Sequence, residues 1–120
     1  MTYHTKYTMG EAIRQYEKAF NALGDPTRRT IFKKLQNGPL PVVAIAKGLT
    51  VSRPAVSQHL KVLREAQLIN ISSQGAQNIY EIDPKGIIAM RDYLDQFWNE
   101  ALDRFKQLAE QSEKKKTKSK

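Results

Sequence analysis

The apolar residues of this chain recur at helical spacing in five stretches, and in one stretch they alternate with polar residues. The first stretch predicts a helix over residues 10–23, which Gly24 ends. Asp25 is a good N-cap, and Pro26 suits the first helical position because its missing N–H needs no partner there. This pair predicts a second helix, which ends at the turn signal of residues 37–39.

Two shorter helices are predicted next, with a tight turn between them. The third covers residues 42–49, and the fourth covers residues 53–66, with Ser52 as its N-cap and Pro54 in its first turn. Each has a single apolar stripe. The stripes consist of Val42, Ile45, Ala46 and Leu49 in the third helix and of Val56, Leu60 and Leu63 in the fourth.

The pattern then changes to alternation. Ile69 and Ile71 alternate with polar residues, as do Tyr80 and Ile82, and the polar segment 73–77 between them contains a glycine, so a β-hairpin is predicted. Asp83 and Pro84 repeat the earlier capping signal and open a long last helix. Its apolar stripe consists of Ile87, Met90, Leu94, Phe97, Trp98, Ala101, Leu102, Phe105 and Leu108.

A short helix, a tight turn, a second helix and a hairpin are the parts of a winged helix-turn-helix, so we expect a mainly α fold with a small β-hairpin wing. In such a unit the second helix enters the major groove, and its outward face must be polar and rich in donors. Pro54, Ser57, Gln58 and Lys61 occupy that face, and Arg53 begins it. Gln58 suits adenine, Arg53 suits guanine, and Lys61 suits a phosphate or guanine. The polar face of a lone amphipathic helix is usually just exposed to solvent. Here the short helix before it, the turn and the hairpin after it favour DNA binding instead.

Length and charge agree with this interpretation. At 120 residues the chain is expected to be one domain, residues 10–110, between a flexible lead-in, residues 1–9, and a disordered basic tail, residues 111–120. The net charge of +8 attracts polyanions, but it falls to +4 without residues 113–120. Cysteine is absent, which excludes disulfides and thiolate metal sites. We expect a cytoplasmic protein with no membrane contact.

The segments LGDPTRRTIFKKL, IAKGLTVSRPAVSQHLKVLREAQLI and IYEID resemble the arsenical-resistance-type (ArsR/SmtB) family of winged helix-turn-helix repressors. The resemblance covers about residues 11–110. It implies a homodimeric transcriptional regulator, usually a repressor, that binds an imperfect inverted repeat in double-stranded DNA and dimerises through its first and last helices. The base-contacting positions of the family fall on Arg53, Pro54, Ser57 and Gln58.

Two sets of interface residues are therefore expected. The DNA-contacting set is Arg53, Pro54, Ser57, Gln58 and Lys61, with Gln74 and Gln77 at the wing. The dimer set is Ile13, Tyr16, Phe20, Leu94, Phe97, Trp98, Ala101 and Phe105. The aromatic residues of the last helix could instead line an effector pocket, although a dimer core is the commoner use of such a stripe.

The chain departs from the family at four places. The metal-binding cysteines of some relatives are missing from PVVAIAKGL, and Asp92 and Asp95 have no histidine beside them on the last helix. We therefore expect no metal and no cofactor. Gln67 stands where relatives have glycine, which predicts a left-handed residue that costs about 1 kcal/mol relative to glycine. The wing tip has glutamines instead of arginines, so the salt dependence of DNA binding should be shallow.

Three other side chains invite different interpretations. Ser57 and His59 point in different directions on a helix and cannot form a catalytic dyad, so His59 is expected to be half-buried and hydrogen-bonded near the third helix. Arg28 and Arg29 lie in the first turn of a helix, where cations are disfavoured, so one of them is expected to have a specific carboxylate or phosphate partner, either in a structural ion pair, which we favour, or in DNA. We expect that the protein is not an enzyme. A protein-interaction module that uses the last helix is the alternative function, and the operator and the inducing signal remain open.

Overall fold

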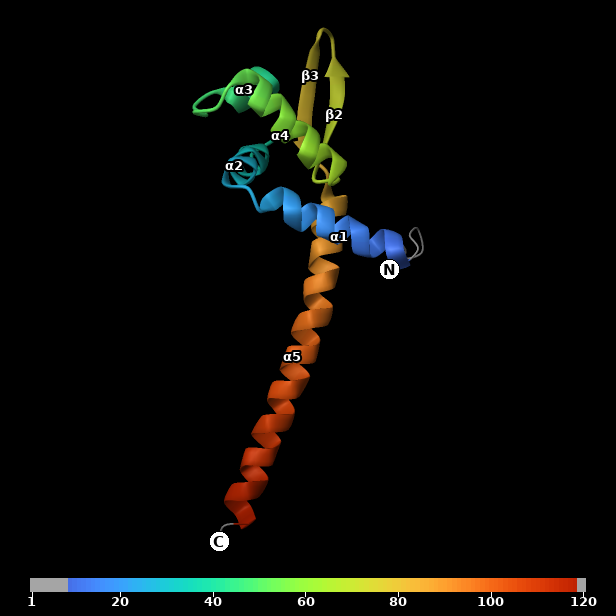
Figure 1. Cartoon of the computed structure of the whole chain (residues 1–120), viewed down its shortest axis with the longest axis vertical. Helices are drawn as coiled ribbons and strands as arrows, with labels where there is room; N and C mark the ends of the chain where they lie inside the picture. Colours follow the sequence, from blue (N-terminus) through green and yellow to red (C-terminus); the bar gives the residue numbers. More distant parts are fainter. Residues whose placement is uncertain (1–8, 119–120) are drawn as a thin grey trace. The chain divides into compact units, whose positions relative to one another are not determined.

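The computed structural model describes residues 9–118 and the surroundings of side chains 15–114. Figure 1 shows a mainly helical chain with a small sheet, and the winged helix-turn-helix prediction is confirmed. Residues through Met90 belong to one compact part, and residues from Arg91 on belong to a second. The elements are α1 (Met9–Leu23), α2 (Pro26–Leu35), β1 (Leu40–Pro41), α3 (Val42–Ala46), α4 (Arg53–Glu65), β2 (Ile69–Gln74), β3 (Gln77–Ile82) and α5 (Pro84–Lys118).

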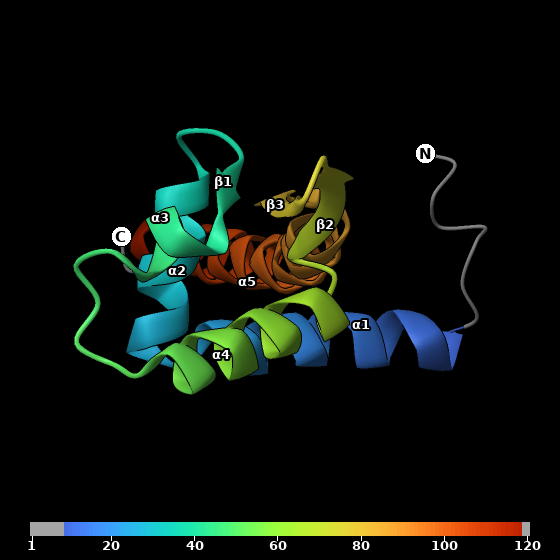
Figure 2. The same ribbon diagram turned by 90° about the horizontal axis from the view of Figure 1, so that it is seen from above.

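The core of the first part is built by the apolar stripes of the helices and the start of the wing. In Figure 2, α4 lies alongside α1, which also contacts α2. Burying these side chains removes apolar surface from water, which stabilises the fold by about 25 cal/mol per Å². The buried apolar residues are Ala19, Ala22, Ile31, Phe32, Leu35, Ile45, Val56, Leu60, Leu63, Ala66, Leu68 and Ile69.

The predicted helix starts are confirmed by their hydrogen bonds. The Arg28 N–H donates to Asp25 Oδ2 at 3.0 Å, with Pro26 at the first helical position of α2. This backbone hydrogen bond, helped by the Arg28 charge, lowers the pKa of Asp25 from its ordinary value. The Lys85 N–H donates to Asp83 Oδ1 at 3.0 Å and caps α5 in the same way. Local capping signals in the sequence therefore set where these helices begin.

The sheet has three antiparallel strands in the order β1–β3–β2, one more than was predicted. Leu40 pairs with Tyr80 and Pro41 with Ile79, so β1 is an edge strand, where proline's missing N–H is tolerated. In the hairpin, Gln74 pairs with Gln77, so the turn is only Gly75 and Ala76. The wing strands are therefore longer than the predicted loop 73–77 allowed.

Helix α3 is shorter than the predicted 42–49 and ends at Ala46. Gly48 has a φ of 82°, a conformation that stops a helix and favours glycine. The Lys34 ammonium group donates to the carbonyl of Ile45 at 3.0 Å and also to that of Lys47. This lysine, which the sequence pattern did not single out, satisfies the carbonyls at the end of α3 and links α2 to the turn before α4.

Helix α5 continues through Lys118, so the prediction of a disordered tail over residues 111–120 was wrong for the described residues 111–118. Six of these eight residues are lysine, glutamine or glutamate, which are strong helix formers, and this offsets the lack of apolar residues. The predicted lead-in lies outside the described residues except at Met9, where α1 begins. That residues 10–110 act as one functional domain stays a prediction. No helix of the described chain is long and apolar enough to cross a membrane.

Candidate nucleic-acid interface

Helix α4 is held by its buried face and its N-terminal cap. Val56, Leu60 and Leu63 are almost fully buried in the core. Ser52 Oγ accepts from the Ala55 N–H at 3.3 Å, and the Ser52 carbonyl accepts from the Val56 N–H at 3.0 Å. Ser52 therefore begins the helix as predicted, and α4 ends one residue earlier than expected, at Glu65.

The opposite face of α4 is exposed to solvent. Arg53, Ser57 and Lys61 follow one another at steps of four, and Pro54 and Gln58 form the adjacent row. All five side chains are exposed, and among the described residues none of them has a hydrogen bond or ion pair. We call these five residues the readout face. The face offers a guanidinium, an ammonium, an amide and a hydroxyl, which are the groups that pair with base edges and phosphates in the major groove.

Arg28 connects α4 to the two helices before it. Its Nε donates to the Ala22 carbonyl at 2.6 Å and its Nη2 to the Asn21 carbonyl at 3.3 Å, at the end of α1. Its Nη1 lies 3.4 Å from Nδ1 of His59 on α4. Because a guanidinium can only donate, Nδ1 of His59 is the acceptor in this contact. His59 is half-buried and hydrogen-bonded as predicted, but its hydrogen-bond partner is on α2.

Arg29 also binds the end of α1, through a 2.8 Å bond from Nη1 to the Leu23 carbonyl. Among the described residues, the side chains of both arginines donate to backbone carbonyls and neither forms an ion pair with a carboxylate, so the expected structural ion pair is not found, and a phosphate partner stays a prediction. Both arginines instead satisfy carbonyl groups at a helix C-terminus, where positive charge is stabilising. Their position in an unfavourable first turn was a sound signal of a specific partner, but the partner is backbone, which a sequence pattern does not reveal.

The C-terminus of α4 is a Schellman turn, and the predicted left-handed residue is confirmed. Gln67 has a φ of 57°. Its N–H donates to the Arg64 carbonyl at 2.9 Å, and the Leu68 N–H donates to the Leu63 carbonyl at 3.0 Å. Two further bonds fix this turn. Gln15 Nε2 on α1 donates to the Ala66 carbonyl at 2.8 Å, and the Gly86 N–H on α5 donates to the Gln67 carbonyl at 2.8 Å.

The contact between this turn and the start of α5 is backbone against backbone. A Cβ added at Gly86 would lie 2.8 Å from the Ala66 carbonyl oxygen and 2.9 Å from that of Gln67. These distances leave no room for any side chain at Gly86. Helix α4 is therefore fixed at its start by Ser52, in its middle by His59 and at its end by the Schellman turn, while its readout face stays unattached.

The wing carries the remaining predicted DNA-contacting residues. Gln74 and Gln77 are exposed, and they flank the tip, where Gly75 has a φ of 62°. Ser73 Oγ donates to Asn78 Oδ1 at 3.4 Å across the strands. Residues 69–80 contain no charged side chain, so the hairpin can offer hydrogen bonds but adds no cationic attraction to a polyanion.

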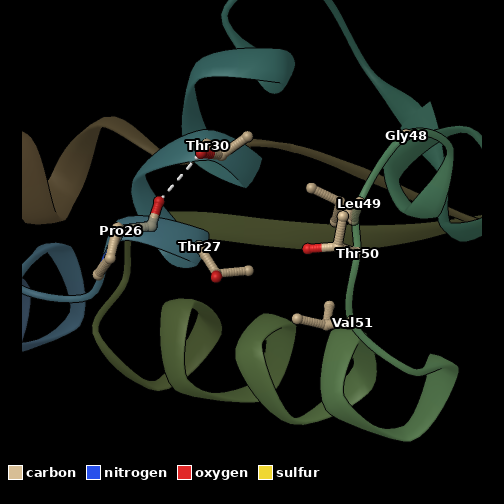
Figure 3. Close-up of a pocket in the computed structure, with 7 residues that line it drawn as sticks. All are labelled: Pro26, Thr27, Thr30, Gly48, Leu49, Thr50 and Val51. Atoms are coloured by element: carbon tan, nitrogen blue, oxygen red, sulfur yellow. Dashed lines mark hydrogen bonds between the residues drawn. The ribbon is translucent and has the colours of Figure 1, made fainter.

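A shallow pocket of about 190 Å³ lies between the first turn of α2 and the segment that leads into α4 (Figure 3). Thr27 and Thr50 line it, and the Thr30 hydroxyl donates to the Pro26 carbonyl at 3.0 Å. It has no charged lining residue. Among the described residues, no three His, Cys, Asp or Glu side chains are grouped in a way that could hold a metal ion.

The predicted dimer residues fall in both parts of the chain. Tyr16 and Phe20 are half-buried on α1, with ring centroids 6.3 Å apart in an edge-to-face arrangement. The surroundings of the Ile13 side chain lie outside the described residues. The α5 members of the set, Leu94, Phe97, Trp98, Ala101 and Phe105, are exposed in the single chain.

An exposed polar helix that follows a short helix and a tight turn, beside a β-hairpin, defines a winged helix-turn-helix transcriptional regulator that binds DNA. Residues 25–70, which run from the cap of α2 to the first residues of the wing, match the model of the "Bacterial regulatory protein, arsR family". Together with the relatives described next, this match shows that the chain belongs to the arsR family.

The chain is 48% identical over 95 residues to the HTH-type transcriptional regulator Rv2034 of Mycobacterium tuberculosis, covering 79% of this chain and 89% of that protein. It is 32% identical over 81 residues to the arsenical resistance operon repressor of Bacillus subtilis, covering 67% of this chain and 77% of the repressor. Among solved structures, an ArsR-like transcriptional regulator from Rhodococcus sp. RHA1 superposes with a TM-score of 0.68 at 26% identity, covering 81% of this chain and 94% of the regulator.

Proposed function

We propose that this protein represses transcription as a homodimer that binds an imperfect inverted repeat, with the α4 of each protomer in a major groove. The observation that carries the proposal is the readout face, which is exposed and unpaired on a helix anchored at both ends. A two-fold protein matches a two-fold operator, with the half-sites one helical turn of DNA apart. That the Bacillus subtilis relative is named a repressor supports the direction of regulation.

The chemistry of the readout face suggests a role for each side chain. Gln58 would accept from and donate to adenine, and Arg53, at the helix N-terminus, would bind guanine with both guanidinium nitrogens. Ser57 would bond a base edge or a phosphate, and Lys61 would bind a phosphate or guanine. Gln74 and Gln77 would bond the sugar–phosphate backbone or the minor groove.

The dimer is supported by the exposed apolar stripe of α5, together with Tyr16 and Phe20 on α1. Because the proposed target is operator DNA, the proposed location is the cytoplasm. The proposal includes no catalysis, no metal and no cofactor, and it leaves the operator and the effector to experiment. The chain has no cysteine and only two histidines, which limits thiol and imidazole chemistry as inputs.

The double substitution of Ser57→Ala with Gln58→Ala tests the proposal. A gel-shift titration would use DNA from upstream of the chain's own gene, at moderate salt and with excess nonspecific competitor. Each lost base contact should cost about 1–3 kcal/mol, so operator affinity should fall at least about tenfold while nonspecific affinity changes little. The matched control is Gln36→Ala with Asn37→Ala, two exposed residues at the end of α2. Unchanged discrimination by the readout variant would refute the proposed face.

A further inference from the structure

Arg28 joins three helices of the first compact part. Its N–H donates to the Asp25 carboxylate at 3.0 Å, which fixes its backbone at the start of α2. Its side chain reaches the end of α1, where the carbonyls of Ala22 and Asn21 accept at 2.6 and 3.3 Å. The remaining guanidinium nitrogen, Nη1, lies 3.4 Å from Nδ1 of His59 on α4. A guanidinium is planar and its donors form a rigid fork, so the bonds to α1 determine where Nη1 points.

The contact with Arg28 gives the middle of α4 a directional restraint. The buried face of α4 is apolar, and apolar burial has no direction, so it resists a small rotation of the helix about its axis only weakly. The Ser52 cap and the turn at Gln67 hold the two ends. His59 is half-buried between them and directly follows Gln58 of the readout face. Because hydrogen bonds depend on angle, its bond from Arg28 favours one rotation of α4 over its neighbours.

A small rotation of α4 is enough to spoil base contacts. Helix side chains end about 5–6 Å from the axis, so a rotation of about 20° moves their ends by about 2 Å. A binding group has to lie within about 0.5 Å of its productive position, and hydrogen bonds also weaken as their angle closes. Attraction between a lysine and a phosphate has no comparable requirement, because the ammonium group acts as a point charge. Rotation would therefore lower discrimination between base sequences before it lowered general attraction to DNA.

We propose that Arg28 and His59 are positioning residues for the readout face: their contact sets the rotation of α4, so that Gln58 meets a base edge at hydrogen-bond geometry. Neither residue has to touch DNA for this role. The inference rests on the proposed binding of operator DNA through the readout face. It adds two residues behind that face that determine its sequence specificity.

Two substitutions separate the acceptor of His59 from its bulk. His59→Leu keeps a side chain of similar size that cannot accept a hydrogen bond. His59→Asn carries an amide oxygen on Cγ, where the ring has Nδ1, so it can still accept from Arg28. Each full-length variant is titrated in gel shifts against DNA from upstream of the chain's own gene and against DNA of the same length with a shuffled sequence.

The leucine variant should lose specificity and the asparagine variant should keep it. His59→Leu should lower the affinity for the upstream DNA at least about fivefold, which is the low end of the cost of one lost base contact. Its affinity for the shuffled DNA should stay within about twofold of the parent chain, because the phosphate contacts are unchanged. His59→Asn should bind both DNAs within about twofold of the parent chain, since the acceptor is restored.

A double-mutant cycle measures whether His59 acts through Gln58. In the parent chain, Gln58→Ala should lower the affinity for the upstream DNA at least about fivefold. In the His59→Leu chain the same substitution should cost less than about twofold, because the contact is already lost. Gln77→Ala at the wing is the matched control and should cost the same factor in both chains. A His59 that only stabilised the fold would leave the cost of Gln58→Ala unchanged.

The outcomes distinguish this inference from the proposed function. Full affinity of His59→Leu for the upstream DNA, with a loss in Gln58→Ala, would overturn the positioning role and leave the readout face standing. An asparagine variant as weak as the leucine variant, or an equal cost of Gln58→Ala in both chains, would overturn it as well. No cost of Gln58→Ala in the parent chain would instead refute the readout role of Gln58. Urea unfolding checks that each variant is folded, and His59→Phe, which keeps a planar ring without an acceptor, replaces a leucine variant that is not.

Discussion

Gln67→Gly is predicted to stabilise the protein. Gln67 is the one described non-glycine residue with positive φ, at 57°, and the two Schellman hydrogen bonds hold it there. A Cβ in this conformation costs about 1–2 kcal/mol, which glycine avoids. Glycine gives back part of that gain, about 0.4–1 kcal/mol, through the greater freedom of its unfolded chain.

A second contribution comes from the end of the Gln67 side chain. Its Oε1 is buried and accepts no hydrogen bond from the described residues, and a buried unpaired polar atom is destabilising. The two effects together give a net stabilisation of about 1 kcal/mol. For a compact part of fewer than 100 residues, this corresponds to a rise in melting temperature of about 4–8 °C.

The measurement is urea and thermal unfolding at fixed protein concentration, because dimerisation also raises apparent stability. Gln67→Ala is the matched control, since it removes the amide but keeps the Cβ and the backbone strain. The glycine variant should be more stable than both the alanine variant and the parent chain. A melting temperature of Gln67→Gly equal to or below that of the parent would refute the proposed backbone strain. Equal increases in stability for the glycine and alanine variants would assign the effect to the buried amide alone.

Three further changes test other parts of the structure. Gly86→Ala should lower the unfolding free energy by about 2 kcal/mol in urea titrations, because its Cβ would lie 2.8 Å from a carbonyl oxygen at the end of α4; an unchanged midpoint would contradict this close approach. The folded-state pKa of Asp25 is lowered, so its carboxylate stabilises the fold at neutral pH, and this contribution is lost as pH falls below about 4. In Asp25→Asn the unfolding free energy should therefore fall less steeply at acid pH than in the parent chain. An identical dependence of the unfolding free energy on pH would count against the cap. Gln77→Lys should steepen the slope of log affinity against log salt by about 2 for the dimer, and an unchanged slope would place the wing away from the phosphates.

The elements that could be predicted from the sequence are those with local signals. Asp25 with Pro26, and Ser52 with Pro54, place their caps next to the helices that they start, whereas the left-handed Gln67 was predicted only from the glycine that relatives have there. The exposed face of α4 followed from the spacing of its buried residues. For the caps and the exposed face, the physical cause lies within a few residues of the effect, so a local pattern is enough.

The features that the sequence did not reveal depend on distant partners. Strand β1 has two residues, one of them proline, and it exists because Leu40 pairs with Tyr80, forty positions away. Arg28 binds carbonyl groups of α1 and a histidine of α4, none of which is marked by residue type. The direction in which a second copy docks depends on another molecule, so the dimer residues remain predictions.

The separation between the supports of α4 and its readout face has a consequence for how this regulator can evolve. The described residues that fix the helix are the buried stripe, the cap, His59 and the terminal turn, and none of them belongs to the readout face. Arg53, Ser57, Gln58 and Lys61 can therefore change with little penalty to folding, since exposed substitutions away from structural contacts are usually within about 0.5 kcal/mol of neutral. Duplicated copies of this gene could thus acquire new operators one base pair at a time while keeping the same scaffold.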